Sequence, residues 1–118
     1  MPKVSVVILL VLATLFAVDA SVRVCNYGGY LAKCHLVSRS LSFGYQRRVQ
    51  DTGLFAVTQC RTLDIPVDAV WNGLECRELA FIAIYKSIFR QEFASSMYTY
   101  CYEITGTTLM PRWAQTSC

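Results

Sequence analysis

The residues most able to do chemistry in this chain are six cysteines, at positions 25, 34, 60, 76, 101 and 118. Thiolate metal sites favour closely spaced pairs such as Cys-x-x-Cys, or histidines nearby. Here no two cysteines are closer than nine residues, and His35 is the only histidine. The spacing therefore predicts no metal and no cofactor. It predicts instead that all the cysteines form disulfides: Cys25, Cys34, Cys60, Cys76, Cys101 and Cys118.

The pairing of these cysteines is open except near the C-terminus. Cys118 is the last residue, and a terminal cysteine frays with its backbone unless it is bonded. Cys101 is the nearest thiol in sequence, so we expect a disulfide between Cys101 and Cys118. Six cysteines allow many connectivities, and the partners of the other four stay unassigned.

Nucleophilic catalysis needs a general base beside a serine or cysteine, and the sequence offers little of this kind. His35 falls on the polar side of a predicted strand, which is typical of a surface histidine. Carboxylate pairs stand at Glu75 with Glu78 and at Asp64 with Asp68. Hydrolytic carboxylate sites depend on a spatial separation that sequence does not give. We therefore predict that the protein is not an enzyme, and we rank a small secreted hydrolase below a binding protein.

Residues 1–20 have the pattern of an export signal. Lys3 gives a positive start, an apolar run covers residues 4–16, and residues 18–20 supply the small side chains that precede a cut. The run is shorter than the ~20 apolar residues that cross a bilayer, and no later stretch is long and apolar enough to replace it. We expect a signal peptide at residues 1–20. Residues 21–118 are then a single secreted, extracellular domain without a transmembrane segment.

The charge of the chain is mild. The formal net charge is +3 and the basic residues are scattered. The one local basic pair, Arg47-Arg48, is typical of a solvated loop. This charge excludes the strongly basic class of nucleic-acid binders and is compatible with contact to an anionic surface.

The clearest strand signal lies in residues 96–118. Tyr98, Tyr100, Tyr102 and Ile104 alternate with polar residues and Cys101. A period of two places one aromatic row on one face of a sheet and the cysteine-bearing row on the other. A tyrosine-rich strand is therefore expected here, with a second layer of the fold packed over it.

Earlier segments give the same kind of pattern. Residues 21–26 suggest a short strand, and residues 26–29 a glycine-containing turn. A strand over residues 30–39 would put four side chains inside: Tyr30, Ala32, Cys34 and Leu36. Residues 38–53 predict a loop or a short edge strand. Residues 54–65 predict one extended stretch that ends before Pro66, with Phe55, Val57, Leu63 and Ile65 on one side.

The segment from residue 75 to residue 93 is ambiguous, because it is apolar on nearly every side. We favour strand, since isoleucine and aromatic residues are common there and the neighbouring segments are extended. Asn72-Gly73 is then expected to be a hairpin turn that pairs this strand with residues 54–65. The predicted fold is all-β, a small disulfide-linked antiparallel β-sandwich or barrel. The alternative is an α+β fold with one helix around residues 75–93.

Aromatic residues give the main functional signal, because so small a core cannot bury all of them and Tyr and Trp favour contact surfaces. The candidate binding surface consists of seven of them: Tyr27, Tyr30, Trp71, Tyr98, Tyr100, Tyr102 and Trp113. Equally, most of them could simply fill the core. We predict a secreted, non-enzymatic binding or effector protein whose partner is an extracellular protein, a glycan or a lipid surface. The alternative is a membrane-active, lipid-binding or pore-forming, toxin-like protein.

Overall fold

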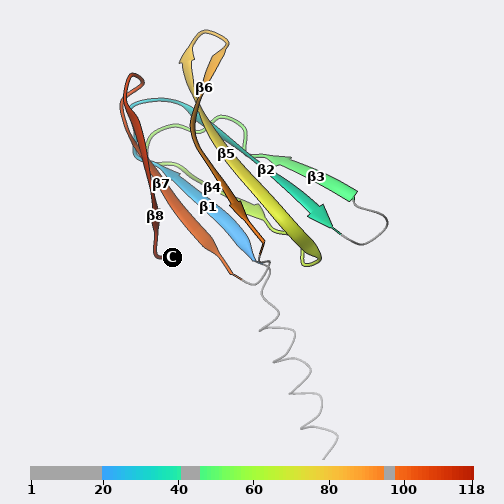
Figure 1. Ribbon diagram of the computed structural model, residues 1–118. Helices are drawn as coiled ribbons and strands as arrows, with labels where there is room; N and C mark the ends of the chain where they lie inside the picture. Colours follow the sequence, from blue (N-terminus) through green and yellow to red (C-terminus); the bar gives the residue numbers. More distant parts are fainter. Residues whose placement is uncertain (1–19, 41–45, 95–97) are drawn as a thin grey trace, which may run out of the picture.

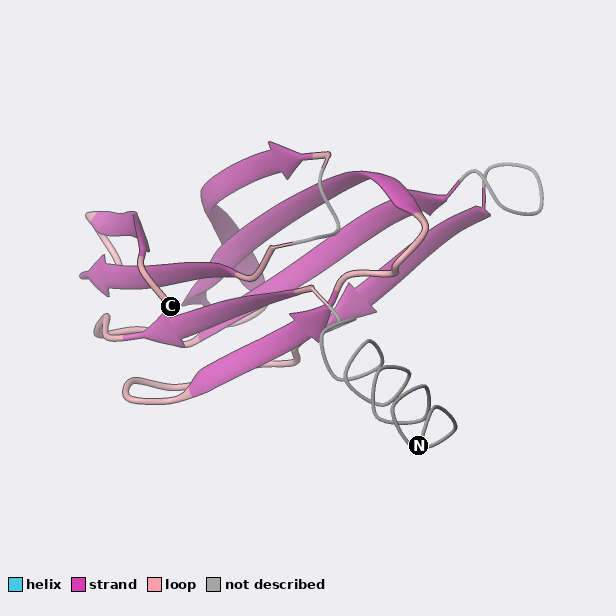
Figure 2. Ribbon diagram, turned by 90° about the horizontal axis from the view of Figure 1, so that it is seen from below, coloured by secondary structure: helices cyan, strands magenta, loops and turns pink. Residues whose placement is uncertain are grey.

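The protein is a sandwich of two sheets, and the computed structural model describes residues 20–40, 46–94 and 98–118. Figure 1 shows the two layers, and every regular element within these residues is a strand (Figure 2). One sheet has the order β4 (Cys60–Asp64), β1 (Ser21–Asn26), β7 (Tyr100–Gly106) and β8 (Pro111–Thr116). The other has the order β3 (Gln46–Asp51), β2 (Ala32–Ser40), β5 (Ala69–Phe81) and β6 (Ile84–Phe93).

The predicted all-β sandwich is confirmed, and the helical alternative for residues 75–93 is not what the structure has. Neighbouring strands pair antiparallel except β1 with β7, which run parallel. The chain alternates between the two layers. β1 and β7 both enter the same sheet from the same end of the sandwich, so they run in the same direction. Of the predicted signal peptide, residues 1–19 lie outside the described residues.

The alternating pattern of β2 fixes which side of that sheet faces the core. Tyr30, Ala32, Cys34 and Leu36 are buried as predicted, while His35 on the other side is half-exposed. Buried side chains from both sheets fill the space between the layers, among them Val22, Val24, Phe55, Ile65, Leu74 and Ile104. Burial of such side chains is the main force that holds the two layers together.

All three predicted disulfides are present. Cys101 pairs with Cys118 as expected, and the unassigned four pair as Cys25–Cys60 and Cys34–Cys76. Cys25 and Cys60 lie directly opposite each other on β1 and β4, and Cys34 and Cys76 do so on β2 and β5. Each bridge therefore fastens segments of one layer and leaves the contact between layers to packing.

Two sequence predictions are wrong: the single extended stretch over residues 54–65 and the turn at Asn72-Gly73. Residues 54–65 are not one extended stretch: the chain reverses at Thr58, whose φ is 72°, and β4 begins only at Cys60. Val57 is exposed as a result, whereas Phe55, Leu63 and Ile65 are buried as predicted. For residues 38–53 the sequence predicted a loop or a short edge strand. The edge strand is present, because Arg47 and Arg48 lie in β3 with both side chains exposed.

Asn72-Gly73 is not a hairpin turn, because both residues lie inside β5. Asn72 is fully buried and accepts a hydrogen bond from the Ser38 hydroxyl at 2.8 Å, which draws it into the sheet instead. The real reversal comes ten residues later, between β5 and β6, where Ala83 has a φ of 71°. The predicted single strand over residues 75–93 is thus two paired strands.

Candidate functional site

The predicted aromatic surface does not form one patch. Tyr100, Tyr102 and Trp113 line the β6–β8 edge of the core, where Trp113 stacks on Phe89 with ring centres 4.7 Å apart. Tyr100 stacks in the same way on Phe93, at 4.3 Å. Burial raises the pKa of Tyr102, with a smaller contribution from Tyr100. Tyr102 is buried in the core, whereas Trp113 covers the edge of the sandwich and keeps 40% of its surface exposed.

Tyr30 is buried as well, and its hydroxyl donates to the Thr105 carbonyl oxygen at 2.7 Å. Burial, and then the nearby Glu78, raises the pKa of Tyr30 to about 12. The remaining candidates lie apart from one another. Tyr27 lies where β1 ends and Tyr98 lies just before β7 at the opposite end, while Trp71 lies on the outer face of β5.

A different group of exposed side chains does come together at one end of the sandwich. Four connections meet there, namely β1–β2, β3–β4, β5–β6 and β7–β8, at the top of Figure 1. They carry most of the large apolar side chains that are exposed, including Ile82 with 97% and Leu109 with 81% of its surface open. We call this surface the apolar end, and its members are Tyr27, Leu31, Leu54, Val57, Phe81, Ile82, Ile84, Leu109 and Met110.

Charge is absent from these connections. Residues 27–31, 53–59, 79–84 and 106–110 contain no Asp, Glu, Lys or Arg. Loops are normally polar because they face water, and a large exposed apolar patch marks an interaction site. The combination of four uncharged connections with outward apolar side chains is therefore the strongest functional feature of the molecule.

The backbone beneath the apolar end is tied down by hydrogen bonds between the connections. The Gly29 N–H donates to the Gly106 carbonyl at 3.1 Å, and the Leu79 N–H donates to the Leu31 carbonyl at 2.9 Å. Ala32 and Phe55 exchange a reciprocal pair of bonds at 3.0 and 2.9 Å. The polar groups of the loops are thus used internally, which leaves the side chains as the outward surface.

Asn26 organises the first of these connections from inside. Its fully buried side-chain amide donates to the carbonyls of Tyr30 and Phe55, at 2.8 and 3.2 Å. Its side-chain oxygen accepts the Gly28 N–H at 2.8 Å. One side chain therefore links the β1–β2 turn to the β3–β4 connection.

A basic residue follows each uncharged connection at a constant distance along the chain. Lys33, Arg61, Lys86 and Arg112 each stand two positions beyond the last residue of an uncharged connection. Lys33 pairs with Asp51 at 3.5 Å, and the Arg61 guanidinium lies 5.6 Å from the Phe55 ring centre. We call these four residues the basic collar.

Glu78 lies in the core below this end. It is opposite Ala32 on the inner face, with 0% of its surface exposed. Neither carboxylate oxygen has a hydrogen-bond partner within the part of the chain that the structure describes. Burial raises the pKa of Glu78, and the positive charge of Lys86 opposes this only in part.

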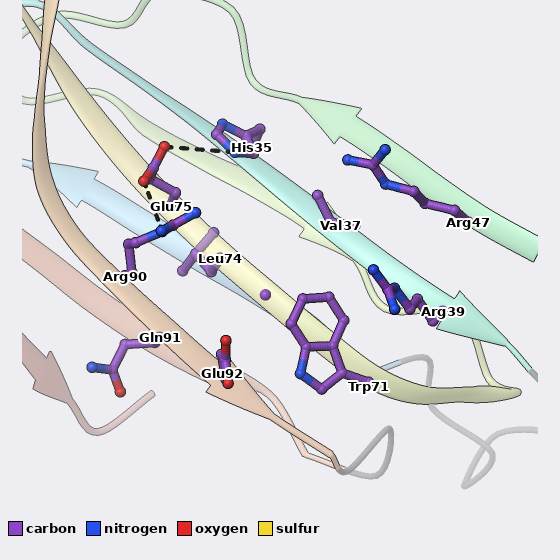
Figure 3. A pocket seen from close by; sticks show the side chains of 11 residues that line it. His35, Val37, Arg39, Arg47, Trp71, Leu74, Glu75, Arg90, Gln91 and Glu92 are labelled. Carbon is purple, nitrogen blue, oxygen red and sulfur yellow. Dashed lines mark ion pairs between the residues drawn. The ribbon is translucent and has the colours of Figure 1, made fainter.

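Glu75 has the opposite environment, on the outer face. It pairs with Arg77 at 2.5 Å, with Arg90 at 2.8 Å and with His35 at 3.8 Å. The last two ion pairs are dashed in Figure 3. Because Glu75 and Glu78 lie on opposite faces of β5, they do not form the carboxylate pair that a hydrolase would need. The other acidic candidates, Asp64 and Asp68, flank the β4–β5 corner.

Comparison with known proteins identifies the fold. No family model matches the sequence, and no curated protein matches it either. Among solved structures, the membrane-binding domain of pneumolysin matches with a TM-score of 0.68 and 13% identity, over 86% of this chain and 98% of that domain. The likeness is one of fold.

Longer proteins contain a part with a similar fold. The cytotoxin suilysin from Streptococcus suis matches with a TM-score of 0.70 and 18% identity, over 85% of this chain. A non-haemolytic pneumolysin from Streptococcus pneumoniae gives 0.70 and 14% over the same share. The chain spans 23% of the length of suilysin and 24% of that pneumolysin.

No helix among residues 20–40, 46–94 and 98–118 is long and apolar enough to cross a bilayer.

Sequence reasoning missed the apolar end, because its members are spread over four segments and carry no motif. The signal that could have found it is the lack of charge in those segments, which is visible only once they are known to be neighbours.

Proposed function

We propose that this protein binds the surface of a lipid bilayer through its apolar end. The observation that carries the proposal is the gathering of exposed, uncharged side chains from four connections at one end of a rigid sandwich. Each large apolar side chain that is fully transferred from water into the bilayer contributes about 1.5–3 kcal/mol to the binding free energy. Phe81, Ile82 and Leu109 are the most exposed members of the apolar end and would supply most of this energy.

The basic collar supports the same orientation. Lys and Arg side chains keep their charged ends at headgroup depth while their stems cover apolar surface. Each contributes about 1 kcal/mol of attraction to an anionic leaflet. Tyr27 adds a side chain of the kind that is enriched at membrane interfaces. The mild positive charge of the whole chain adds to this attraction rather than opposing it.

The fold of the solved membrane-binding domain of pneumolysin supports the proposal by analogy. The three disulfides fit an oxidising, extracellular compartment, where the outer surface of a membrane is accessible. We propose binding rather than catalysis, because the two carboxylates Glu75 and Glu78 face away from each other. This function is the membrane-active alternative of the sequence analysis, and it replaces the general binding or effector protein as the preferred proposal.

Vesicle sedimentation tests the proposal. Residues 21–118 are mixed with vesicles of phosphatidylcholine, with and without phosphatidylserine, and the bound fraction is measured. We expect saturable binding that strengthens with the anionic lipid. Ile82→Asp and Leu109→Asp should each weaken binding at least tenfold, because a charge replaces a side chain that enters the interface.

The matched control is Tyr98→Asp, which places the same charge on an exposed side chain at the opposite end, where 66% of Tyr98 is open. Its binding should stay close to that of the unmodified protein. Equal loss in Tyr98→Asp and Ile82→Asp, or no binding to either vesicle by folded protein, would contradict the proposal. Release of an encapsulated dye in the same samples reports whether attachment also damages the bilayer.

A further inference from the structure

A second surface of the molecule has the chemistry of a ligand site, and it lies away from the apolar end. It is a depression on the outer face of the β3-β2-β5-β6 sheet with a volume of about 250 Å³ (Figure 3). All four strands contribute to its lining. We call it the groove.

The strand register explains why the sheet is hollow here. Arg47, Arg39 and Trp71 stand in one row across β3, β2 and β5. The next row holds only Val37 and Gly73 on the central strands. Small residues between two rows of long side chains leave an open space above the sheet.

Gly73 also determines how Trp71 lies. A Cβ atom at Gly73 would come within 2.6 Å of a Trp71 ring carbon, so the ring occupies the space that a side chain would take. The indole therefore lies along the sheet and forms part of the groove wall (Figure 3). It is half-buried, which leaves part of an aromatic surface open to a ligand.

The arginines of the first row have no acid to balance them. Arg39 and Arg47 are directly opposite each other, and like charges in that position destabilise a sheet. No carboxylate among the described residues pairs with either. The guanidinium of Arg39 instead lies over an aromatic ring, 5.3 Å from the Trp71 ring centre. Nearby Glu75, in contrast, already has two arginine partners.

We propose that the groove binds an acidic sugar. Two adjacent guanidinium groups are suited to a carboxylate or sulfate, because each offers a fork of N–H donors. The apolar C–H face of a sugar ring packs on the open indole surface. The Glu92 carboxylate, beside Gly73 in the register, accepts hydrogen bonds from sugar hydroxyls.

The position of the groove fits a glycan better than a lipid headgroup. Nine residues of extended chain separate Gly73 from Ile82, which amounts to roughly 30 Å along β5. This step alone rests on the proposed membrane function: with the apolar end on a bilayer, the groove stands above the headgroups, where cell-surface sugars lie. The ligand chemistry itself does not depend on that function.

Calorimetric titration without membranes tests the proposal independently of vesicle binding. The probes are 3′-sialyllactose, a sulfated heparin disaccharide, and lactose as the neutral counterpart. We expect saturable binding of at least one acidic probe, weakened by added salt, and no binding of lactose. Sialyllactose alone would identify a carboxylate ligand, and the heparin disaccharide alone a sulfate ligand. Either result supports the groove as an acidic-sugar site.

Variants of one strand provide the control. Arg47→Gln should weaken the acidic sugar at least tenfold, because it removes a charged hydrogen-bond donor. Arg48→Gln changes the neighbouring residue of β3, which does not line the groove, and should bind as the unmodified protein does. Circular dichroism confirms that each variant is folded. Absence of binding to both acidic probes, equal binding of lactose, or equal loss in Arg48→Gln would overturn the proposal.

Discussion

The apolar end and the groove share strand β5 but present opposite chemistry to water. From Trp71 to Arg77 the outer face of β5 belongs to a charged surface, and from Leu79 to Phe81 the strand carries no charge at all. The groove holds the ion pair of Glu75 with Arg90 beside Arg39 and Arg47, whereas the connections of the apolar end carry no charge. One strand therefore serves two surfaces that suit different partners.

The difference shows how each surface is stabilised. Side chains at the apolar end contribute little to folding, because they remain in water, and the backbone bonds beneath them supply the rigidity. In the groove, the side chains contact one another through ion pairs and the Trp71 ring. Changes at the apolar end should thus alter binding without altering stability, and changes to its supporting turns should alter both.

The largest effect is expected when the two substitutions at the apolar end are combined in one variant. Ile82→Asp with Leu109→Asp should lower vesicle affinity by about the product of the single losses, at least 100-fold, because both hairpins enter the same interface. The midpoint of thermal unfolding should stay nearly unchanged, since both side chains are exposed. Sedimentation and calorimetry measure the two quantities. A double variant no weaker than either single variant would show that the two hairpins do not contribute independently to binding.

A substitution in a turn that supports the apolar end should lower stability, unlike the substitutions of exposed side chains there. Gly106 has a φ of 86°, and a Cβ there would collide with the Met110 carbonyl oxygen. Gly106→Ala should therefore destabilise the protein by about 1–3 kcal/mol, measured by urea unfolding. It should weaken vesicle binding too, because Leu109 is displaced with the turn. The control is Gly53→Ala, which also has a positive φ but has nothing near its Cβ position. If both variants lose the same stability, the collision is not the cause.

Glu78 lies on β5 between the two surfaces, and its burial predicts a pH dependence. The pKa of a glutamate in an unfolded chain is about 4.3, and burial raises the pKa of Glu78 in the folded protein. Protonated Glu78 therefore contributes fully to the free energy of unfolding below its pKa in the unfolded chain. This contribution is lost as the pH rises through its pKa in the folded protein. Glu78→Gln has no proton to lose, so its stability should not fall in that window.

Urea unfolding from pH 4 to pH 8 checks this effect. Glu78→Gln should gain stability relative to the unmodified protein as the pH rises through the raised pKa of Glu78, because only the unmodified protein then buries a charge. Glu103→Gln, on the neighbouring sheet and half-exposed, is the control and should follow the unmodified protein. Parallel pH curves for Glu78→Gln and the unmodified protein would mean that Glu78 does not titrate in this range.

A small change in stability is expected for a substitution in the groove. Gly73→Ala should shift the free energy of unfolding by less than about 1 kcal/mol, because alanine suits a strand better than glycine while its methyl group displaces the Trp71 ring. Acidic-sugar binding should be lost and vesicle binding kept. Intrinsic fluorescence reports the movement of the indole. Retained sugar binding together with an unchanged spectrum would show that Gly73 does not position Trp71.

The sequence predicted much of the fold because alternation is a local signal. Tyr30, Ala32, Cys34 and Leu36 repeat with a period of two, and their burial follows directly. The β5–β6 reversal escaped prediction because it contains no glycine, proline or asparagine, and Ala83 takes a positive φ in an apolar run. Such a turn contradicts ordinary turn chemistry, which is expected where a surface has a function.

The candidate surfaces were harder to predict than the strands. Alternation alone does not show which aromatic residues the second layer covers: Tyr100, Tyr102 and Trp113 line the edge of the core, and Tyr30 lies within the core. The apolar end and the groove both depend on which residues are neighbours across strands, as with Arg39 and Arg47. Only Tyr27 and Trp71 of the predicted surface belong to these two sites.

Fluorescence quenching by lipids with brominated acyl chains tests the central claim most directly. A tryptophan is introduced at the apolar end by Ile82→Trp, or at the opposite end by Tyr98→Trp, and the signal of Trp71 and Trp113 is subtracted with the unmodified protein. The account predicts that bromine quenches the tryptophan at position 82 and leaves the one at position 98 unchanged. Equal quenching at both positions, or quenching at position 98 alone, would contradict it.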